Sequence, residues 1–333
     1  MAESCAKAFV KRAMARRELT LMMLLVVLLV PITMRSPLFL APSNMNRILN
    51  DMAILAIVAI GEFFVILSGG IDLSVGSIIA FTGMVCGMIN ESYPAISPFV
   101  LLFIGLAVGF LMGLVNGVLV AYGKIPPIIT TLGTVNIYRG LTFLLSGGSW
   151  VTAHELSVAY IAFPRNTFLG LSYLLWIAFA VVGICYYFSR YSRTGREIYA
   201  IGGNPTAAKF VGVSENRIRV VVFLVSGTLC GLAGALWTAR YASAVNEMAT
   251  GFEMQAVAAC VLGGVNFSGG AGGIIGVALG TLFLGVVTNA LPVVYLSVFW
   301  QTFVQGLIIL IALALNTISD QRKHRRMLAQ RRA

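Results

Sequence analysis

The sequence has few charged residues and few of the side chains that usually carry catalysis. Only 11% of its 333 residues are charged, against roughly 25% in soluble domains, and its two histidines are His154 and His324. The nearest string to a G-x-x-x-x-G-K-(Ser/Thr) phosphate loop, residues 117–125, has five intervening residues and ends in Ile125. Neither a nucleophile elbow nor an HExxH motif occurs. We therefore expect a protein that is not an enzyme and has no catalytic site, metal or cofactor.

Cysteines are also scarce, and they are scattered along the chain. A disulfide framework or a CxxC metal site needs cysteines at short, regular spacings, which this sequence does not have. Four of the five lie inside apolar runs, where we expect them to be small apolar fillers. The five are Cys5, Cys86, Cys185, Cys230 and Cys260.

Apolar residues, in contrast, are abundant. They make up 59% of the chain, and the mean hydropathy is +0.91. A transmembrane helix needs about 20 mostly apolar residues, and such runs recur along the chain. The ten candidate spans are 19–34, 52–68, 74–89, 99–122, 128–146, 168–188, 218–240, 254–265, 272–291 and 298–316. We expect an all-α, polytopic membrane protein with about ten transmembrane helices, some of them short and interrupted by glycine.

The formal net charge of +11 would fit nucleic-acid binding, but the basic residues gather at the ends of spans. They cluster in the N-terminal segment 1–18, in the loop 189–219 and in the tail 317–333. Positive residues are retained on the cytoplasmic side of a membrane. The pattern predicts a transmembrane domain at 19–316, with both termini and the loop in the cytoplasm.

Two glycine-rich motifs resemble each other. Residues 69–77 read GGIDLSVGS after the second span, and residues 263–270 read GGVNFSGG after the eighth. Asp72 and Asn266 hold matching places, each followed two residues later by a serine. Glycine breaks in matching halves point to a transport path, so we place Asp72, Ser74, Asn266 and Ser268 there. The alternative is that they only cap the helices that follow. The repeat is parallel or, with one span miscounted, inverted.

A few polar side chains fall inside the expected spans. Glu62 and Arg139 are ionisable, and Asn136 is one of several amides. Ionisable groups in a span are costly and usually functional, so these three are further candidates for the path. Amides also serve helix packing. An ion pair between Glu62 and Arg139 would offset the cost of burying both charges.

The loop 189–219 contains a segment suited to contact with another protein. Gly202, Gly203 and Asn204 predict a turn, and Pro205 fits the first position of a short helix that Asn204 can cap. Such a helix could dock on a partner, or it could lie on anionic lipid headgroups.

Four ordered stretches give the chain a family resemblance. They are GEFFVILSGGIDLSVGSIIAFTGM from Gly61, IPPIITTLGT with IYRG from Ile125, GREIYAIGGNPTAAKFVGVSENRIR from Gly195, and the block from Ala256 to Leu291. Over residues 40–316 the chain resembles permease subunits of ribose-, xylose-, allose- and autoinducer-type ABC importers. One departure is Ala271, where many relatives carry a basic residue.

The resemblance implies a function and a set of partners. The chain would translocate a monosaccharide or similar polyol-like solute across the bacterial inner membrane, with a second permease subunit, identical or paralogous. A cytoplasmic ATP-binding subunit would hydrolyse ATP, and a periplasmic binding protein would deliver the sugar. The segment 202–213 would be the coupling helix on the ATPase. Its coupling residues would be Gly202, Gly203, Asn204, Pro205, Ala207, Ala208, Lys209 and Gly212.

Another class of protein fits part of the pattern. A secondary transporter or channel working alone would also use paired, glycine-broken spans. It would need a titratable relay in the membrane, for which Glu62 and Asp72 are the available groups. The sequence specifies neither the sugar nor whether the two permease subunits are identical.

Overall fold

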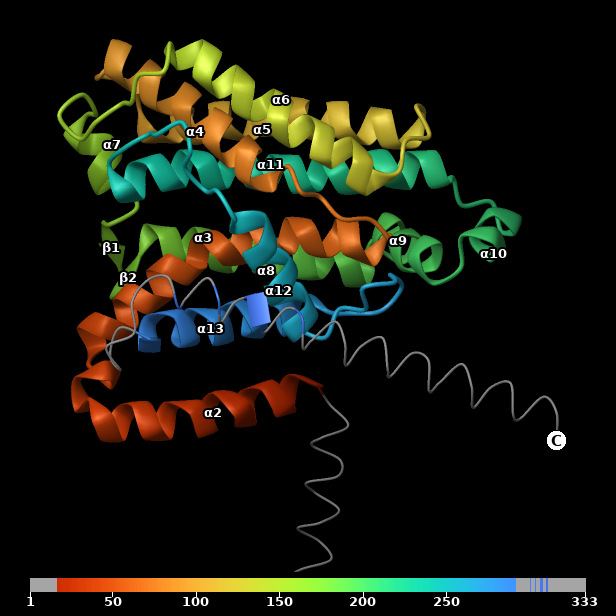
Figure 1. Cartoon of the computed structure of the whole chain (residues 1–333), viewed down its shortest axis with the longest axis horizontal. Coiled ribbons are helices and arrows are strands. Elements are labelled where there is room, and N and C mark those ends of the chain that lie inside the picture. The colour runs from red at the N-terminus through yellow and green to blue at the C-terminus, as the bar shows by residue number, and fades with distance from the viewer. Residues whose placement is uncertain (1–16, 292–299, 301–302, 304–305, 308–309, 311–333) are drawn as a thin grey trace, which may run out of the picture.

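The structure, a computed structural model, describes residues 17–291 together with residues 300, 303, 306, 307 and 310. Figure 1 shows long helices running back and forth along one axis. The elements are α2 (Arg17–Arg35), the 3-10 helix η1 (Pro37–Leu40), α3 (Pro42–Leu67), α4 (Val75–Ser92), α5 (Pro98–Ala121), α6 (Pro127–Ser146), α7 (Val158–Ala162), β1 (Thr167–Phe168), β2 (Leu171–Ser172), α8 (Tyr173–Tyr191), α9 (Arg193–Gly203), α10 (Pro205–Phe210), α11 (Glu215–Tyr241), α12 (Phe252–Leu262) and α13 (Ile274–Ala290).

The helical membrane fold predicted from the sequence is confirmed. Six of the described helices, α3, α4, α5, α6, α8 and α11, are long and apolar enough to cross a membrane. Shorter apolar helices lie at the expected places of the first, eighth and ninth spans. The expected span 298–316 falls largely outside the described residues, as do nearly all of segment 1–18 and all of the tail 317–333.

Two of the predicted boundaries are wrong. Helix α3 begins ten residues before the predicted 52, because Pro42 starts a helix whose polar first turns precede the apolar run. Helix α8 begins five residues after the predicted 168, because residues 167–172 form a β-hairpin. Leu169 and Gly170 both have positive φ angles, as a two-residue hairpin turn requires. Apolar composition alone does not distinguish such a hairpin from the start of a helix.

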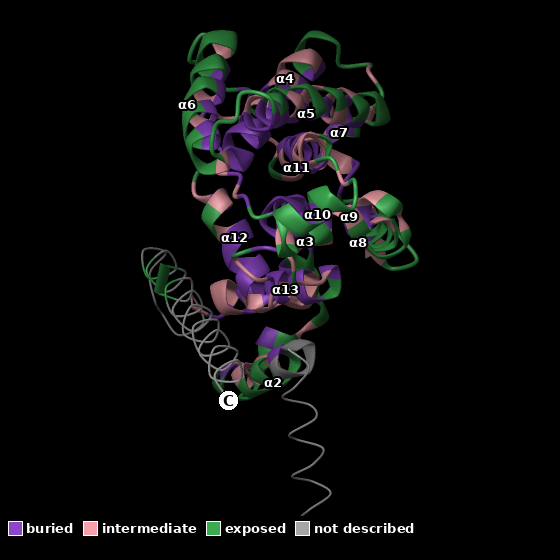
Figure 2. Cartoon of the chain, turned by 90° about the vertical axis from the view of Figure 1, so that its right-hand side faces the viewer, coloured by how far each residue is buried: buried purple, intermediate pink, exposed green. Residues whose placement is uncertain are grey.

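Helices α3 and α11 lie at the centre of the bundle, and α2, α6 and α8 lie at its edges (Figure 2). Glycines bring α11 close to α5. A Cβ atom on Gly109 would collide with the carbonyl oxygen of Gly227, and one on Gly231 would collide with that of Gly105. Small residues that let two backbones approach are typical of helix packing in membranes. The four cysteines at 86, 185, 230 and 260 are buried and reduced, as expected of apolar fillers.

The segment 242–251 enters the bundle without forming a helix and leads into α12. It lies along a glycine face of α4: Cβ atoms on Gly76 and Gly87 would meet the carbonyl oxygen of Ala249 and the Cβ of Ala244. Irregular backbone at membrane depth is tolerated only where protein or a water-filled cavity surrounds it. The eleven residues of α12 are short for a span because this irregular segment precedes them.

The loop 189–219 forms two helices that leave the bundle at one end (Figure 1). The predicted cap is confirmed, since Asn204 Oδ1 accepts a hydrogen bond from Ala207 N at 3.0 Å and Pro205 occupies the first turn of α10. The predicted turn at 202–204 is misplaced. Gly202 and Gly203 are the last residues of α9, because glycine ends a helix as readily as it makes a turn.

Candidate functional site

The two glycine motifs lie together at the end of the bundle that carries α9. Gly270 N in the second motif donates to Leu67 O, at the end of α3, over 2.9 Å. Helices α3 and α12 both run toward this end, and α4 and α13 run away from it (Figure 1). The repeat is therefore parallel.

The motifs share a turn. Ser74 N donates to Asp72 Oδ1 at 3.0 Å, and Ser268 N donates to Asn266 Oδ1 at 3.1 Å. In each case an Asx side chain accepts a hydrogen bond from the backbone two residues on. Asp72 thus acts just before α4 begins and does not cap its first turn, since the residue at the N-cap position is Ser74.

Asp72 is the centre of a buried polar network that connects α3, α5, α6 and α11. Ser74 Oγ donates to Asp72 Oδ1 at 2.5 Å, and Ser226 Oγ on α11 donates to Asp72 Oδ2 at 3.0 Å. Asp72 N donates to Glu62 Oε1 on α3 at 3.1 Å. Glu62, Asp72, Ser74 and Ser226 have no solvent exposure.

The network extends to α5 and α6. Asn116 Nδ2 donates to Ser74 Oγ at 2.8 Å, and the Tyr138 hydroxyl donates to Asn116 Oδ1 at 3.1 Å. The remaining Glu62 oxygen, Oε2, has no hydrogen-bond partner among the described residues. Polar groups that are bonded to one another in this way fix the relative positions of the helices that carry them.

Arg139 and Asn136 lie elsewhere, on α6. Arg139 Nη1 donates to the carbonyl oxygens of Asn246 and Met248, at 2.8 and 2.9 Å, and so holds the irregular segment 242–251 against α6. The Glu62–Arg139 ion pair that the sequence left open does not form, and each group has these other partners instead. Asn136 is exposed, and among the described residues its side chain bonds to its own helix, at Leu132 O.

Asn136 and Arg139 belong to a polar face of the chain. The carboxylates of Glu247 and Glu253 lie close enough to interact electrostatically with the half-buried Arg139. No atom of the described residues lies within 4 Å of the positions that Cβ atoms would take on Gly133 and Gly140 of α6. This side of α6 is therefore not covered by the described part of the chain. Together, Asn136, Arg139, Glu247 and Glu253 form what we call the α6 face.

Within the described part of the chain, Asn266 and Ser268 form no hydrogen bond with Asp72 or Arg139. Ser268 is exposed, and its backbone oxygen lies 3.9 Å from the position that a Cβ atom would take on Gly69. A Cβ atom on Gly202 would collide with Leu67 O and lie 2.5 Å from Gly270 N. The end of α9 thus touches the end of α3 and the backbone of the second glycine motif. We call this contact the α9 junction.

Helix α10 projects beyond the junction (Figure 1). Two of its exposed side chains are absent from the coupling residues predicted above: Phe210 is 88% and Val211 is 78% exposed. The sequence signal that could have identified them is an adjacent apolar pair within a basic loop. Ala208 is only 3% exposed and packs against its own chain, so it cannot enter a partner's cleft as its place in the coupling segment suggested. Lys209 Nζ pairs with Glu215 Oε2 at 2.7 Å.

Apolar spans, a paired glycine repeat and an enclosed polar network define a multi-pass membrane permease. The comparisons with known proteins identify the particular kind. The family described as "branched-chain amino acid transport system / permease component" matches residues 44–313, and the chain belongs to this family. It is therefore a transport subunit and not an enzyme.

Individual relatives cover most of the chain. It is 37% identical to the ribose import permease protein RbsC of Bacillus subtilis over 88% of this chain and 90% of that one. It is 37% identical to RbsC of Escherichia coli K12, over 86% and 90% of the two chains. It is 35% identical to the autoinducer 2 import permease LsrC of Escherichia coli, over 89% and 86%. No solved structure matches.

Proposed function

We propose that this chain is the membrane-spanning subunit of an ABC importer that moves a monosaccharide, or a similar small polyol-like solute, across the bacterial inner membrane. Its similarity to ribose and autoinducer 2 import permeases over nearly nine-tenths of the chain supports this substrate class. A separate cytoplasmic subunit hydrolyses the ATP, in keeping with the lack of a phosphate loop in this sequence. A periplasmic binding protein delivers the solute.

The position that we propose for the transport path rests on the α6 face. Arg139, Glu247 and Glu253 are charged groups within or beside apolar helices, and such groups are costly against lipid. They are tolerated where they face a water-filled cavity or another protein. We therefore place the path between this face and the same face of a second permease subunit. Asn136 offers an amide to a solute rich in hydroxyl groups.

The buried network and the second motif have supporting places in this proposal. Glu62, Asp72 and Ser74 form the wall behind the path, because they bind α3, α5, α6 and α11 to one another. We assign Asn266 and Ser268 to the cytoplasmic exit, because they precede Gly269 and Gly270, which lie against the end of α9.

Helix α10 is the surface that we assign to the ATPase. Phe210 and Val211 expose apolar area on a loop outside the bundle, and apolar anchors of this kind fill pockets in protein partners. The α9 junction then joins this contact to the end of α3 and to the second glycine motif, so movement of the ATPase has a direct mechanical connection to α3 and to the segment between α12 and α13.

Reconstitution tests the function. The full chain, its ATPase and its binding protein are placed in vesicles, and uptake of labelled ribose and other pentoses is followed. We expect uptake that requires ATP, the binding protein and an active ATPase. Uptake by the chain alone, driven by an ion gradient, would instead identify a secondary transporter.

A further inference from the structure

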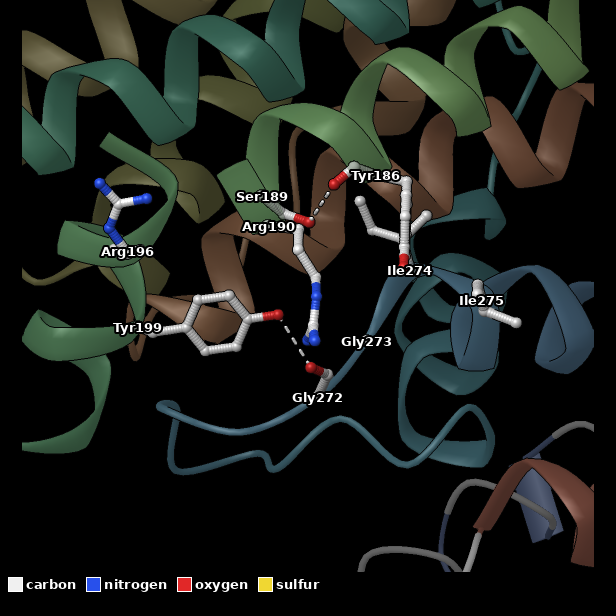
Figure 3. A pocket seen from close by; sticks show the side chains of 9 residues that line it. All are labelled: Tyr186, Ser189, Arg190, Arg196, Tyr199, Gly272, Gly273, Ile274 and Ile275. Atoms are coloured by element: carbon white, nitrogen blue, oxygen red, sulfur yellow. Dashed lines mark hydrogen bonds between the residues drawn. The ribbon is translucent and has the colours of Figure 1, made fainter. Parts of the chain in front are cut away.

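A basic pocket outside the path lies between the ends of α8, α9 and α13. It has a volume of about 520 Å³, and its lining includes Arg190, Arg196 and Tyr199 together with residues 272–275. Figure 3 shows the Arg190 side chain reaching from α8 toward Gly272 and the Tyr199 hydroxyl. No acidic side chain lies among the residues that line the pocket. The pocket is thus suited to an anion.

The positive groups keep much of their capacity to bind a ligand. Arg190 forms no ion pair and no side-chain hydrogen bond within the part of the chain that is described, and Arg196 uses one nitrogen, Nη1, to donate to Tyr191 O at 3.1 Å. Helix α13 starts at the pocket with Gly273 as its N-cap and no side-chain cap. Figure 3 shows the Arg196 guanidinium at the edge of the pocket, pointing away from Gly272. The first N–H groups and the positive dipole end of α13 therefore add mainly to the Arg190 guanidinium.

The walls are held in place. The Tyr199 hydroxyl donates to Gly272 O at 2.9 Å and so ties α9 to the segment before α13. Ser189 Oγ donates to Tyr186 O at 3.0 Å. Burial raises the pKa of the Tyr199 phenol, against the opposing effect of Arg190, so this hydroxyl keeps its proton. The pocket exists before any ligand enters.

The surroundings indicate which anion. Ile275 of the lining is an exposed apolar side chain of α13, and Ile184 and Tyr187 are exposed on α8, the helix that carries Arg190. Tyrosine is enriched at the level of lipid headgroups, and basic pockets between membrane helices on the cytoplasmic side bind anionic headgroups. The α10 surface assigned to the ATPase contributes no residue to the lining. We infer that this pocket binds the phosphate headgroup of an anionic phospholipid, whose acyl chains lie against the exposed apolar side chains of α8 and α13.

Native mass spectrometry of the full chain tests this inference. Protein released from nanodiscs of mixed phosphatidylglycerol and phosphatidylcholine should retain phosphatidylglycerol selectively. The double substitution Arg190→Gln and Arg196→Gln should lower this retention. One arginine near an anionic membrane surface contributes about 1 kcal/mol, which corresponds to about fivefold, so we expect a fall of at least that size. Arg193→Gln is the matched control, because Arg193 lies on α9 outside the lining and pairs with Glu197 at 2.8 Å. It should retain the lipid.

The remaining outcomes separate the alternatives. Equal retention of both lipids by the unsubstituted chain, or unchanged retention by the double variant, overturns the inference. Binding of inorganic phosphate without phosphatidylglycerol would assign the pocket to a soluble anion and overturns the lipid. Loss of ATPase co-purification with unchanged lipid retention would make it a partner surface, which also overturns it. The double variant Arg190→Lys and Arg196→Lys, which keeps both charges, should restore most of the retention if the loss came from charge and not from misfolding.

Discussion

At the scale of single residues, Asp72 shows how a charged position can serve structure. Its carboxylate accepts three hydrogen bonds, from Ser74 N, Ser74 Oγ and Ser226 Oγ, with no cation among these partners. The carboxylate is fully enclosed. The value of Asp72 to the fold therefore lies in its acceptor oxygens, which an amide can partly reproduce.

We expect Asp72→Asn and Asp72→Ala to differ sharply. Asparagine keeps an oxygen for both Ser74 donors and offers its NH₂ group to the Ser226 hydroxyl, so its loss of stability should stay below about 1 kcal/mol and uptake should persist. Alanine leaves buried donors without acceptors, at about 1 to 3 kcal/mol each. Thermal unfolding in detergent and uptake by vesicles measure the two effects. Loss of uptake by a well-folded Asp72→Asn protein would show that the charge itself is needed.

Arg139 allows a second residue-scale prediction. Replacement by Met removes two charge-assisted hydrogen bonds to segment 242–251, each worth about 1.5 to 3 kcal/mol. We expect faster hydrogen exchange in peptides that cover 242–251, and little change in α11. The control is Arg165→Met, which removes a single exposed bond, to Arg240 O. If exchange in 242–251 is the same in both variants, Arg139 does not anchor the segment.

At the scale of elements, the sequence identified most of the helices but not the irregular segments between them. Apolar runs mark a span because lipid demands them, which is why α4, α5, α6, α11 and α13 lie close to their predicted ranges. Segment 242–251 was not foreseen, because its position depends on α4 glycines and on Arg139, which are distant in the sequence. The same limit applies to the pair of Glu62 and Arg139: composition identifies a costly charge but not its partner.

The packing of α5 on α11 gives an element-scale prediction. Gly109→Val would place a branched side chain against the backbone of Gly227 and Gly231. Overpacking of this kind costs typically 1 to 3 kcal/mol, and the cost rises where backbone is the obstacle. We expect a strong fall in folded protein recovered from membranes, measured by fluorescence-detected size-exclusion chromatography. Gly183→Val on α8, where nothing lies within 4 Å, is the matched control and should be recovered normally.

The exposed apolar pair of α10 predicts a coupling defect. Phe210→Ser should leave the permease inserted and abundant, because the Phe210 side chain is exposed, but should reduce ATPase co-purification at least tenfold, as expected for an interface anchor worth about 2 kcal/mol. Ala208→Glu is a less suitable test of docking than Phe210→Ser, since a buried charge there would disturb α10 itself. Phe168→Ser, at an exposed phenylalanine in β1, is the control. Equal ATPase binding by both variants would contradict the docking assignment.

At the scale of the whole molecule, α9 and α10 lie at one end of the bundle, and α7 and the β-hairpin lie at the other (Figure 1). The basic residues of loop 189–219 gather at the first end, where the α9 junction also lies. Retention of positive residues on the cytoplasmic side predicts that this end faces the cytoplasm. The proposed docking of α10 on a cytoplasmic ATPase requires the same orientation.

This orientation can be tested by cysteine labelling, because the native cysteines at 86, 185, 230 and 260 are buried. Cys5 is replaced by serine, and a single cysteine is introduced at Val158 of α7 or Thr206 of α10, both exposed positions. A membrane-impermeant maleimide should label Val158→Cys in spheroplasts and Thr206→Cys only in inverted vesicles. The protein lacking both introduced cysteines should stay unlabelled in either preparation. Labelling of Thr206→Cys from outside the cell would reverse the orientation and would remove α10 from the reach of a cytoplasmic ATPase.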